Sequence, residues 1–462
     1  MDFFLQIKDD KLEFIENTGK KLTGSDGETV YYFGTILNPD SILESFINNR
    51  KNQTSLTQGI HGNFSVICIE KNGYAYIFQD IMGGNRTIYY TVHENRVYLA
   101  TSIKYFKKIG LKYKFNTSVA DEFIYNGVIK TRDTLLCGVY KLLPGEYIKI
   151  VSGIPSVLSD FPELKNQSVP EIDDLYKQET AIIKEYVREL KQWSRTVNAT
   201  LSGGYDSNLI LHTINQEGYK ASVYSCGGVR GGDETHIAQK ISDYYDGVEL
   251  EKEYVDENVL RYMKDIVWRL EGALYERGIF LQYILARNLY DHNVKCVMLG
   301  ECADQVFNKN FYSNDNPEFI MTYITHPYEL GSLVVLKKST SMLASFGIQG
   351  LYPFIDDRMI CLGNRTKENN SITKEYQKKM CRAYINPTIL EYIDKKPGST
   401  SLCTLFANRE EEEKFMEDVR NNNEFYRPDF RIVYRYEKHE SELDYYLCLE
   451  YLKCFKEVFC EL

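Results

Sequence analysis

The segment best equipped for chemistry is Leu201-Ser202-Gly203-Gly204-Tyr205-Asp206-Ser207, which is suited to holding nucleotide phosphates. Two adjacent glycines let the backbone approach an anion, and a serine hydroxyl on each side can donate hydrogen bonds. The segment ends an expected strand, 196–201, and opens an expected helix, 208–214, whose free N-terminal amides favour negative charge. Asp206 would repel phosphate, so it implies a divalent cation. An ordinary Gly-Gly turn is the alternative for the segment taken alone.

A second loop with an acidic residue, 300–304, lies about a hundred residues further along the chain. The intervening sequence predicts alternating strands and helices, at 221–226, 235–244, 279–290 and 294–299. This alternation predicts a parallel sheet, in which ligands bind at the carboxyl ends of the strands. Since the loops 202–207 and 300–304 both follow expected strands, we expect them to converge on one crevice.

The composition indicates an enzyme-sized globular protein of two or three domains, with 462 residues of which 43% are hydrophobic. The net charge is −10, and the basic residues are scattered, so no electrostatic footprint for nucleic acid or an anionic membrane is present. Eleven dispersed cysteines without a CxxC pair predict reduced, mostly buried thiols. We find neither a leader-like N-terminus nor a run of about eighteen apolar residues, and we expect a cytoplasmic protein.

The texture of the sequence changes near the middle of the chain. Short strand-like runs separated by Gly and Asn predict an antiparallel, sheet-rich first domain, and they lie at 31–33, 64–69, 74–78 and 147–151. A helical pattern at 172–193 opens an α/β domain, and 155–169 is the expected junction. The last expected helix is 442–459.

Several motifs carry a resemblance to known families. The loop 202–207 resembles the SGGxDS pyrophosphate loop of ATP pyrophosphatases, and 300–307 resembles the LSGEGADELF segment of asparagine synthetases. Three further stretches are similar to motifs of that second family. These are 352–356, similar to RVPFLD; 80–90, similar to the RDxxGxxPLYY turn; and 134–146, similar to TLFxGIxxLPPG. Asp233 and Glu234, with Ala238, look like the acidic helix after its second strand.

The resemblance implies an α/β fold in two domains. Residues 1–165 would be a degenerate glutaminase-like domain, an antiparallel sandwich like those of N-terminal-nucleophile hydrolases. Residues 166–462 would be an ATP pyrophosphatase domain with a parallel sheet, in which a carboxylate attacks ATP and an amine then attacks the acyl-adenylate. Glutamine-using members carry a cysteine nucleophile at the second position, where this chain has Asp2, so we expect no glutaminase activity.

The same resemblance implies roles for individual residues. Ser202, Gly203, Gly204 and Ser207 would hold pyrophosphate, whereas Asp206 and Asp304 would bind Mg²⁺. A helix N-cap is the alternative role for Asp304. ATP-binding contacts are further expected from the following residues: Leu201, Ser225, Gly227 and Gly300.

Two more residues are candidates for catalysis. Lys396 resembles the family lysine before an x-Gly dipeptide, which stabilises developing negative charge; Lys395 is the alternative in register, and a solvated loop is the other interpretation of both. Glu301 stands where β-lactam synthetases have a tyrosine that deprotonates the amine, so its two alternative roles are to act on the amine and to fix its loop. The supporting acid of those enzymes would fall near Lys338, where no carboxylate is found. Asp356 and Asp357 are candidate substitutes for that acid, although we expect Asp356 to anchor its own loop.

The function that the sequence favours is an ATP-dependent, AMP-forming amide ligase, in the version of a lasso peptide cyclase that closes a macrolactam. An ammonia-dependent asparagine synthetase, a β-lactam synthetase-like enzyme and a catalytically silent nucleotide-binding scaffold are the alternatives. ATP and Mg²⁺ are the expected cofactors. The substrate would be a small molecule or a precursor peptide, delivered with a peptide-processing protease or leader-binding protein as partner.

Overall fold

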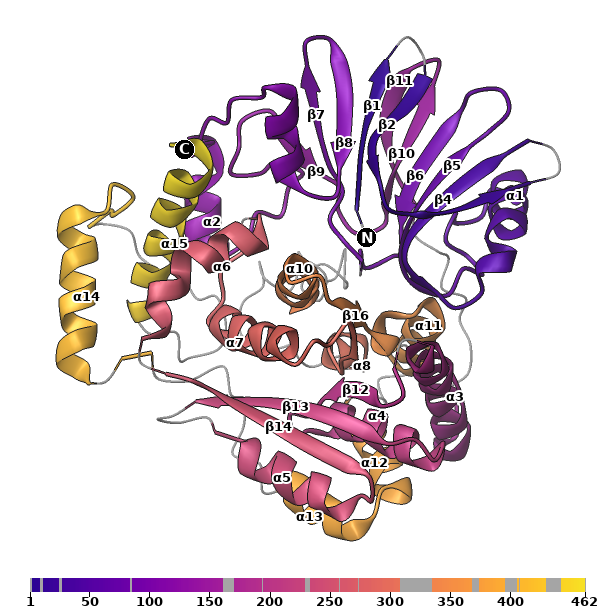
Figure 1. Cartoon of the computed structure of the whole chain (residues 1–462), viewed down its shortest axis with the longest axis vertical. Coiled ribbons are helices and arrows are strands. Elements are labelled where there is room, and N and C mark those ends of the chain that lie inside the picture. The colour runs from indigo at the N-terminus through magenta and orange to yellow at the C-terminus, as the bar shows by residue number, and fades with distance from the viewer. Residues whose placement is uncertain are drawn as a thin grey trace.

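The chain folds into two antiparallel sheets followed by one parallel sheet, as seen in a computed structural model (Figure 1). The residues that the structure describes are 2–8, 11–24, 27–83, 85–160, 170–192, 194–228, 233–256, 258–272, 274–307, 335–367, 374–394, 405–406, 408–428 and 442–461. The expected α/β class, with an antiparallel N-terminal sandwich and a later parallel sheet, is confirmed.

The first 160 residues form the two antiparallel sheets. One has the order β2-β1-β8-β7-β9 and the other the order β11-β10-β6-β5-β4-β3. Their bounds are β1 Phe3–Lys8, β2 Lys11–Asn17, β3 Lys20–Thr23, β4 Thr29–Ile36, β5 Gly62–Ile69, β6 Ala75–Gln79, β7 Tyr89–His93, β8 Arg96–Ala100, β9 Val139–Lys141, β10 Glu146–Val151 and β11 Ile154–Ser159. Helices α1 Ile42–Asn52 and α2 Ala120–Asn126 accompany them.

The two sheets pack face to face because their strands alternate apolar and polar side chains. Along β10 every second residue is buried, and Ile148 and Ile150 join a core that both sheets supply. Phe3 of β1 meets Phe33 of β4 across the sandwich, with ring centroids 5.0 Å apart. On the outer face of the second sheet, α1 buries Phe46 against β6.

The second half of the chain is built around a fully parallel sheet of order β14-β13-β12-β15-β16. Its strands are β12 Val197–Thr200, β13 Ala221–Gly228, β14 Val248–Val255, β15 Cys296–Met298 and β16 Gln349–Leu351. The helices are α3 Ile172–Lys191, α4 Tyr205–Gln216, α5 Thr235–Tyr244, α6 Met263–Leu270, α7 Gly278–Asp291, α8 Ala303–Phe307, α10 Lys337–Ser345, α11 Asp357–Lys367, α12 Lys374–Tyr384, α13 Pro387–Asp394, α14 Arg409–Asn422 and α15 Glu442–Cys460. Short 3₁₀ turns are η1 Pro39–Ser41, η2 Ile103–Ile109, η3 Thr117–Val119, η4 Val259–Tyr262 and η7 Pro353–Ile355.

A layer of helices separates the parallel sheet from the antiparallel sheets. Figure 1 shows α7, α8 and α10 between β12–β14 below and the N-terminal strands above. Backbone hydrogen bonds join the two halves, because Tyr275 N donates to Gly127 O at 2.7 Å and Val128 bridges Leu274. Asn63 and Tyr352 form a second link, in which Tyr352 N donates to Asn63 Oδ1 at 2.8 Å. The C-terminal helix α15 packs on both α6 and α2.

The expected junction at 155–169 was drawn too early. Pro155 lies inside β11, which pairs with β10 throughout, so the antiparallel part continues to Ser159. Pro is tolerated there because β11 is an edge strand of its sheet. The expected boundary between residues 165 and 166 lies outside the described residues. Within the described residues, no helix combines the length and apolar character needed to cross a membrane.

Candidate active site

The loop 202–207 connects β12 to α4 and is held by its own serines. Ser202 N donates to Ser207 Oγ at 3.3 Å, the two hydroxyls lie 3.2 Å apart, and Gly204 N approaches Ser202 Oγ at 3.4 Å. Asn208 Nδ2 donates to Gly204 O at 2.9 Å and fastens the loop to the first turn of α4. The helix begins at Tyr205, three residues before the expected start, so Asp206 lies in its first turn. The result is a compact turn with backbone amides at a helix N-terminus, which is the geometry of an anion-binding loop.

Gly203 meets two requirements that other residues would not. Its φ is +75°, a left-handed conformation that side chains disfavour, and a Cβ there would lie 3.0 Å from Ile237 Cγ2 of α5. The loop therefore packs directly on the helix that follows β13.

The loop 300–304 touches the loop 202–207, as the sequence predicted. Strands β12 and β15 pair in parallel at Ala199 and Met298, which brings their carboxyl ends to one edge. A Cβ at Gly300 would lie 3.1 Å from Ser207 N and 3.3 Å from Asp206 Cβ. Glycine thus permits this contact, and Asp304 follows in the first turn of α8.

Glu301 is half-buried beside a half-buried ion pair that the sequence did not predict. Lys338 of α10 is paired with Glu276, which precedes α7. Burial raises the pKa of the Glu301 carboxyl; the charge of Lys338 lowers this pKa, and those of Glu276 and Asp304 raise it. Burial acts to lower the pKa of Lys338, but Glu276 and Glu301 raise it above its usual value. The pKa of the Glu301 carboxyl, which follows Gly300 in the loop 300–304, is thus set by burial and by the charges around it.

The pairing of Lys338 with Glu276 could not be predicted from the sequence, because no carboxylate lies near Lys338 along the chain. Glu276 lies 62 residues earlier in the chain, two residues before the start of α7, and its side chain reaches Lys338. Gly278 leaves room for it, since a Cβ there would lie 2.9 Å from Lys338 Nζ. The signal in the sequence was Lys338 itself, which stands where the resemblance to β-lactam synthetases implies an acid.

Three of the residues expected to contact ATP lie in or beside β13, the strand next to β12 in the sheet. Leu201 is buried and its N–H donates to Tyr224 O at 2.9 Å, and Ser225 is buried within β13. Gly227 also has a structural reason, because a Cβ there would lie 2.4 Å from Asp233 Oδ1. That same oxygen accepts from the N–H of Thr235, the first residue of α5, at 2.9 Å.

Lys395 and Lys396 lie outside the described residues. The residue before them in sequence, Asp394, ends α13 and accepts a hydrogen bond of 2.6 Å from Tyr205 Oη. The end of α13 therefore contacts the loop 202–207.

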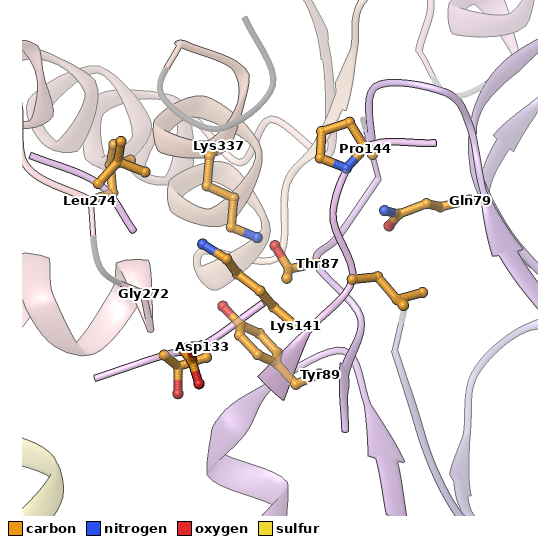
Figure 2. A pocket seen from close by; sticks show the side chains of 13 residues that line it. Gln79, Thr87, Tyr89, Asp133, Lys141, Pro144, Gly272, Leu274 and Lys337 are labelled. Atoms are coloured by element: carbon orange, nitrogen blue, oxygen red, sulfur yellow. The ribbon is translucent and has the colours of Figure 1, made fainter. Parts of the chain in front are cut away.

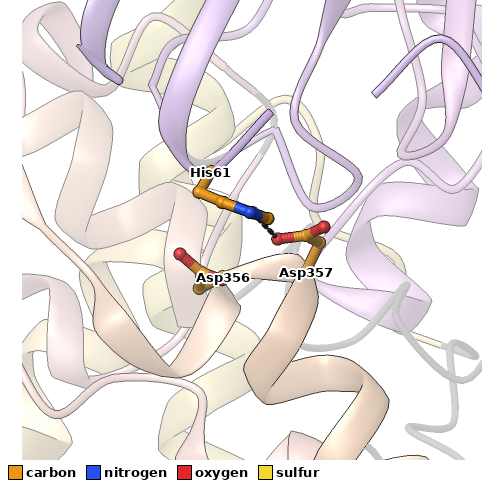
Figure 3. Close-up of side chains that lie close together, drawn as sticks. All are labelled: His61, Asp356 and Asp357. Carbon is orange, nitrogen blue, oxygen red and sulfur yellow. Dashed lines mark hydrogen bonds and ion pairs between the residues drawn. The ribbon is translucent and has the colours of Figure 1, made fainter. Parts of the chain in front are cut away.

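One cluster of potential metal ligands occurs in the described residues, and it lies away from this loop pair. His61 and Asp357 point at one another, with Nδ1 2.7 Å from Oδ1, and Asp356 stands beside them (Figure 3). Asp356 is fully buried, and its oxygens accept from Arg358 at 2.8 and 3.0 Å and from Tyr186 at 3.2 Å. A guanidinium already occupies the place of a cation, so we interpret Asp356 as an anchor of its loop.

Asp2 is held at the base of β1. Its Oδ1 lies 3.2 Å from Arg86 Nε and accepts from Thr101 Oγ1 at 3.1 Å, while its backbone N donates to Thr18 Oγ1 at 2.6 Å. The carboxylate at this position is engaged by a cation, and a carboxylate is not a nucleophile for amide cleavage.

A parallel sheet with a Ser-Gly-Gly loop at the end of its central strand defines an α/β domain of the ATP pyrophosphatase type. Residues 181–318 match the family model described as asparagine synthase. Over this segment the chain is similar to the asparagine synthase family.

Individual relatives agree with this assignment. The amidase chry2 of Gibberella zeae is 26% identical over 275 residues, covering 55% of this chain and 40% of the relative. A probable glutamine-hydrolyzing asparagine synthetase of Dictyostelium discoideum is 23% identical, covering 48% of this chain and 42% of the relative. The microcin J25-processing protein McjC of Escherichia coli is 26% identical over 157 residues, or 32% of this chain and 29% of the relative. This chain thus spans less than half the length of each.

Proposed function

We propose that this protein is an ATP-dependent ligase that adenylates a carboxylate, releases pyrophosphate and joins the acyl group to an amine. The contact between the loops 202–207 and 300–304 carries the proposal, because it gathers glycines, hydroxyls, helix N-termini and two aspartates at one edge of a parallel sheet. The asparagine synthase match over 181–318 covers both loops and supports the same chemistry.

In this proposal, the residues of the loop 202–207 hold the departing pyrophosphate. Ser202, Gly203, Gly204 and Ser207 would supply hydroxyl and amide donors to the phosphates, some of which bond to one another within the loop. The carboxylates in the first turns of α4 and α8, Asp206 and Asp304, fit Mg²⁺, which prefers oxygen ligands and would neutralise phosphate charge. Leu201, Ser225, Gly227 and Gly300 would line the nucleotide.

Glu301 is the proposed group that takes the proton from the attacking amine. A carboxylate is a weak base in water, and burial that raises its pKa brings it closer to the working pH. The charge of Lys338, held by Glu276, acts to lower the pKa of Glu301, so we assign both as positioning residues. Lys396 is proposed as a further cation at the reacting phosphate; it follows two residues after α13, whose last residue, Asp394, contacts Tyr205 of the loop.

The proposed substrate is a precursor peptide in which the ligase closes a macrolactam. The similarity to the microcin J25-processing protein supports this version, as does the engagement of Asp2 by Arg86, which leaves no nucleophile for glutamine at that position. A protease or leader-binding protein would then be the partner. A second candidate is an ammonia-dependent asparagine synthetase, which the similarity to the Dictyostelium protein and the identity of Glu301 favour.

Mass spectrometry of reactions with ATP and Mg²⁺ separates the two candidates. One set contains aspartate with ammonium or with glutamine, and the other contains peptides with an N-terminal amine and an acidic side chain in reach. A peptide product lighter by one water, formed with AMP, supports the cyclase. Asparagine formed from ammonium alone supports the synthetase. If neither set produces AMP, the ligase proposal is contradicted for these substrates.

A further inference from the structure

A cavity of about 40 Å³ lies between the antiparallel part of the chain and α10. Its walls include Gln79, Thr87 and Tyr89 from one side and Lys337 from the other, together with Asp133 and Lys141. None of the residues expected to bind ATP lines it. A space of this size holds a few water molecules or one small polyatomic ion.

Two lysine side chains extend into this cavity from opposite halves of the molecule. Figure 2 shows the amino groups of Lys141 and Lys337 near one another, with the Tyr89 ring below them. Lys337 and Lys338 are neighbours on α10, and successive residues of a helix point in different directions. Lys338 therefore faces Glu276, whereas Lys337 faces the cavity.

Lys337 has no ionic partner among the described residues. Within that part of the chain its amino group makes no hydrogen bond or ion pair, and its nearest aromatic contact is the Tyr89 ring, 5.6 Å from Nζ. Glu271, the carboxylate that attracts it, is already bound by Lys104 at 2.9 Å and by Ile103 N at 3.0 Å. Lys141 donates to the carbonyl of Ile129 and is drawn toward Asp133 and Glu122.

The two lysines therefore give the cavity positive charge that lacks a matching negative charge. Burial and the charges of Lys141 and Arg86 lower the pKa of Lys337 to about 7. Burial lowers the pKa of Lys141 to about 8, against the pull of Glu122 and Asp133. Both lysines are only partly exposed, and a cationic side chain held at a cavity wall is stabilised by a nearby anion.

We propose that this cavity binds a small oxyanion, such as inorganic phosphate or a carboxylate, between the amino groups of Lys141 and Lys337. The hydroxyl of Thr87 is a further wall residue able to donate to it. The side-chain oxygen Oε1 of Gln79, buried without a hydrogen-bond partner, suits an anion that retains one proton. The site joins the two halves of the chain and stands one residue away from Lys338, and its existence does not depend on ligase activity.

Thermal unfolding of the full-length chain tests the site with inorganic phosphate as the probe. Phosphate at constant ionic strength, compared with chloride, should raise the Tm saturably by roughly 1–4 °C. Lys337→Met and Lys141→Met should each remove this increment. Lys112→Met, at an exposed lysine, should retain it. An increment that survives both cavity substitutions, or that Lys112→Met also removes, overturns the proposal.

A second measurement stands independently of whether the variants fold. Crystals of the unaltered protein grown without phosphate or sulfate are soaked in selenate, and anomalous difference maps are calculated. A peak between Lys141 Nζ and Lys337 Nζ supports the site, and repeating the soak with acetate distinguishes a carboxylate preference from a tetrahedral one. Maps without a feature in the cavity after either soak contradict it.

Discussion

Three partly buried charged residues, Glu301, Lys338 and Glu276, interact electrostatically. Lys338 and Glu276 are paired, and they act on the pKa of Glu301 with opposite sign. Burial raises this pKa, and the charge of Lys338 works against that rise. Lys338 is therefore the member of the pair that favours the ionised form of Glu301, which can accept a proton.

Substitutions at the pair should move the acidic limb of the rate–pH profile in opposite directions. Lys338→Met removes the charge that lowers the pKa of Glu301, so the limb moves to higher pH by roughly one unit. Glu276→Gln removes a charge that raises this pKa, and the limb moves to lower pH. The profile of kcat against pH measures both, and shifts of the same sign would show that Glu301 is not the titrating group.

Alanine at either aspartate of the adjoining loops should abolish ATP turnover without unfolding the chain. Asp206→Ala and Asp304→Ala each remove a proposed Mg²⁺ ligand, and we expect losses of about 10²-fold or more in AMP formation. Asp121→Ala, at an exposed position of α2, is the matched control. AMP formation that persists in Asp206→Ala would remove the proposed role of the loop.

At the scale of elements, the turn between β12 and α4 depends on the backbone of Gly203. Gly203→Ala and Gly218→Ala place alanine at nearly the same φ, +75° and +72°, so each should cost about 1 kcal/mol of unfolding free energy. Only Gly203 lies against another helix, since nothing lies within 4 Å of a Cβ at Gly218. We therefore expect a raised KM for ATP in Gly203→Ala alone. Equal KM values for the two variants would contradict a phosphate-binding loop.

The sequence predicted the helices and strands in which apolar side chains recur at a regular interval. α5 was expected at its observed bounds, and α3 buries the apolar face that its spacing indicated. β14 was missed because it is an edge strand with many charged residues, and only Val248 and Leu250 at its start alternate with polar side chains. The contact between the loops 202–207 and 300–304 was predicted because the carboxyl ends of parallel strands lie at one edge of a sheet. The Glu276–Lys338 pair and the Lys141–Lys337 cavity depend on tertiary contacts between distant segments, which spacing alone does not encode.

At the scale of the whole molecule, the antiparallel half docks on the segment 352–357 through polar contacts. Asn63 binds the backbone of Tyr352, and His61 pairs with Asp357. Burial acts to lower the pKa of His61, yet the hydrogen bond and charge of Asp357 raise it above its usual value. The pairing of His61 with Asp357 thus helps to hold the two halves together.

This pair should make stability depend on pH with a definite sign. Because the folded pKa of His61 is raised, its contribution is fully present below the unfolded pKa near 6.5 and is lost as pH rises through the folded pKa. His61→Gln should therefore cost on the order of 1 kcal/mol at pH 6 and less at pH 9, measured by denaturant unfolding. His236→Gln, at an exposed histidine, should show no such difference. A cost that grows with pH would contradict the ion pair.

The most direct test of the central claim is phosphorus NMR of ATP and Mg²⁺ incubated with the unaltered protein and a carboxylate–amine substrate panel that includes aspartate with ammonium and acidic peptides. We predict AMP and pyrophosphate in equal amounts, accompanied by an amide product, and none of these with Asp206→Ala. ADP and inorganic phosphate as the products would contradict cleavage between the α and β phosphates and, with it, the ligase assignment.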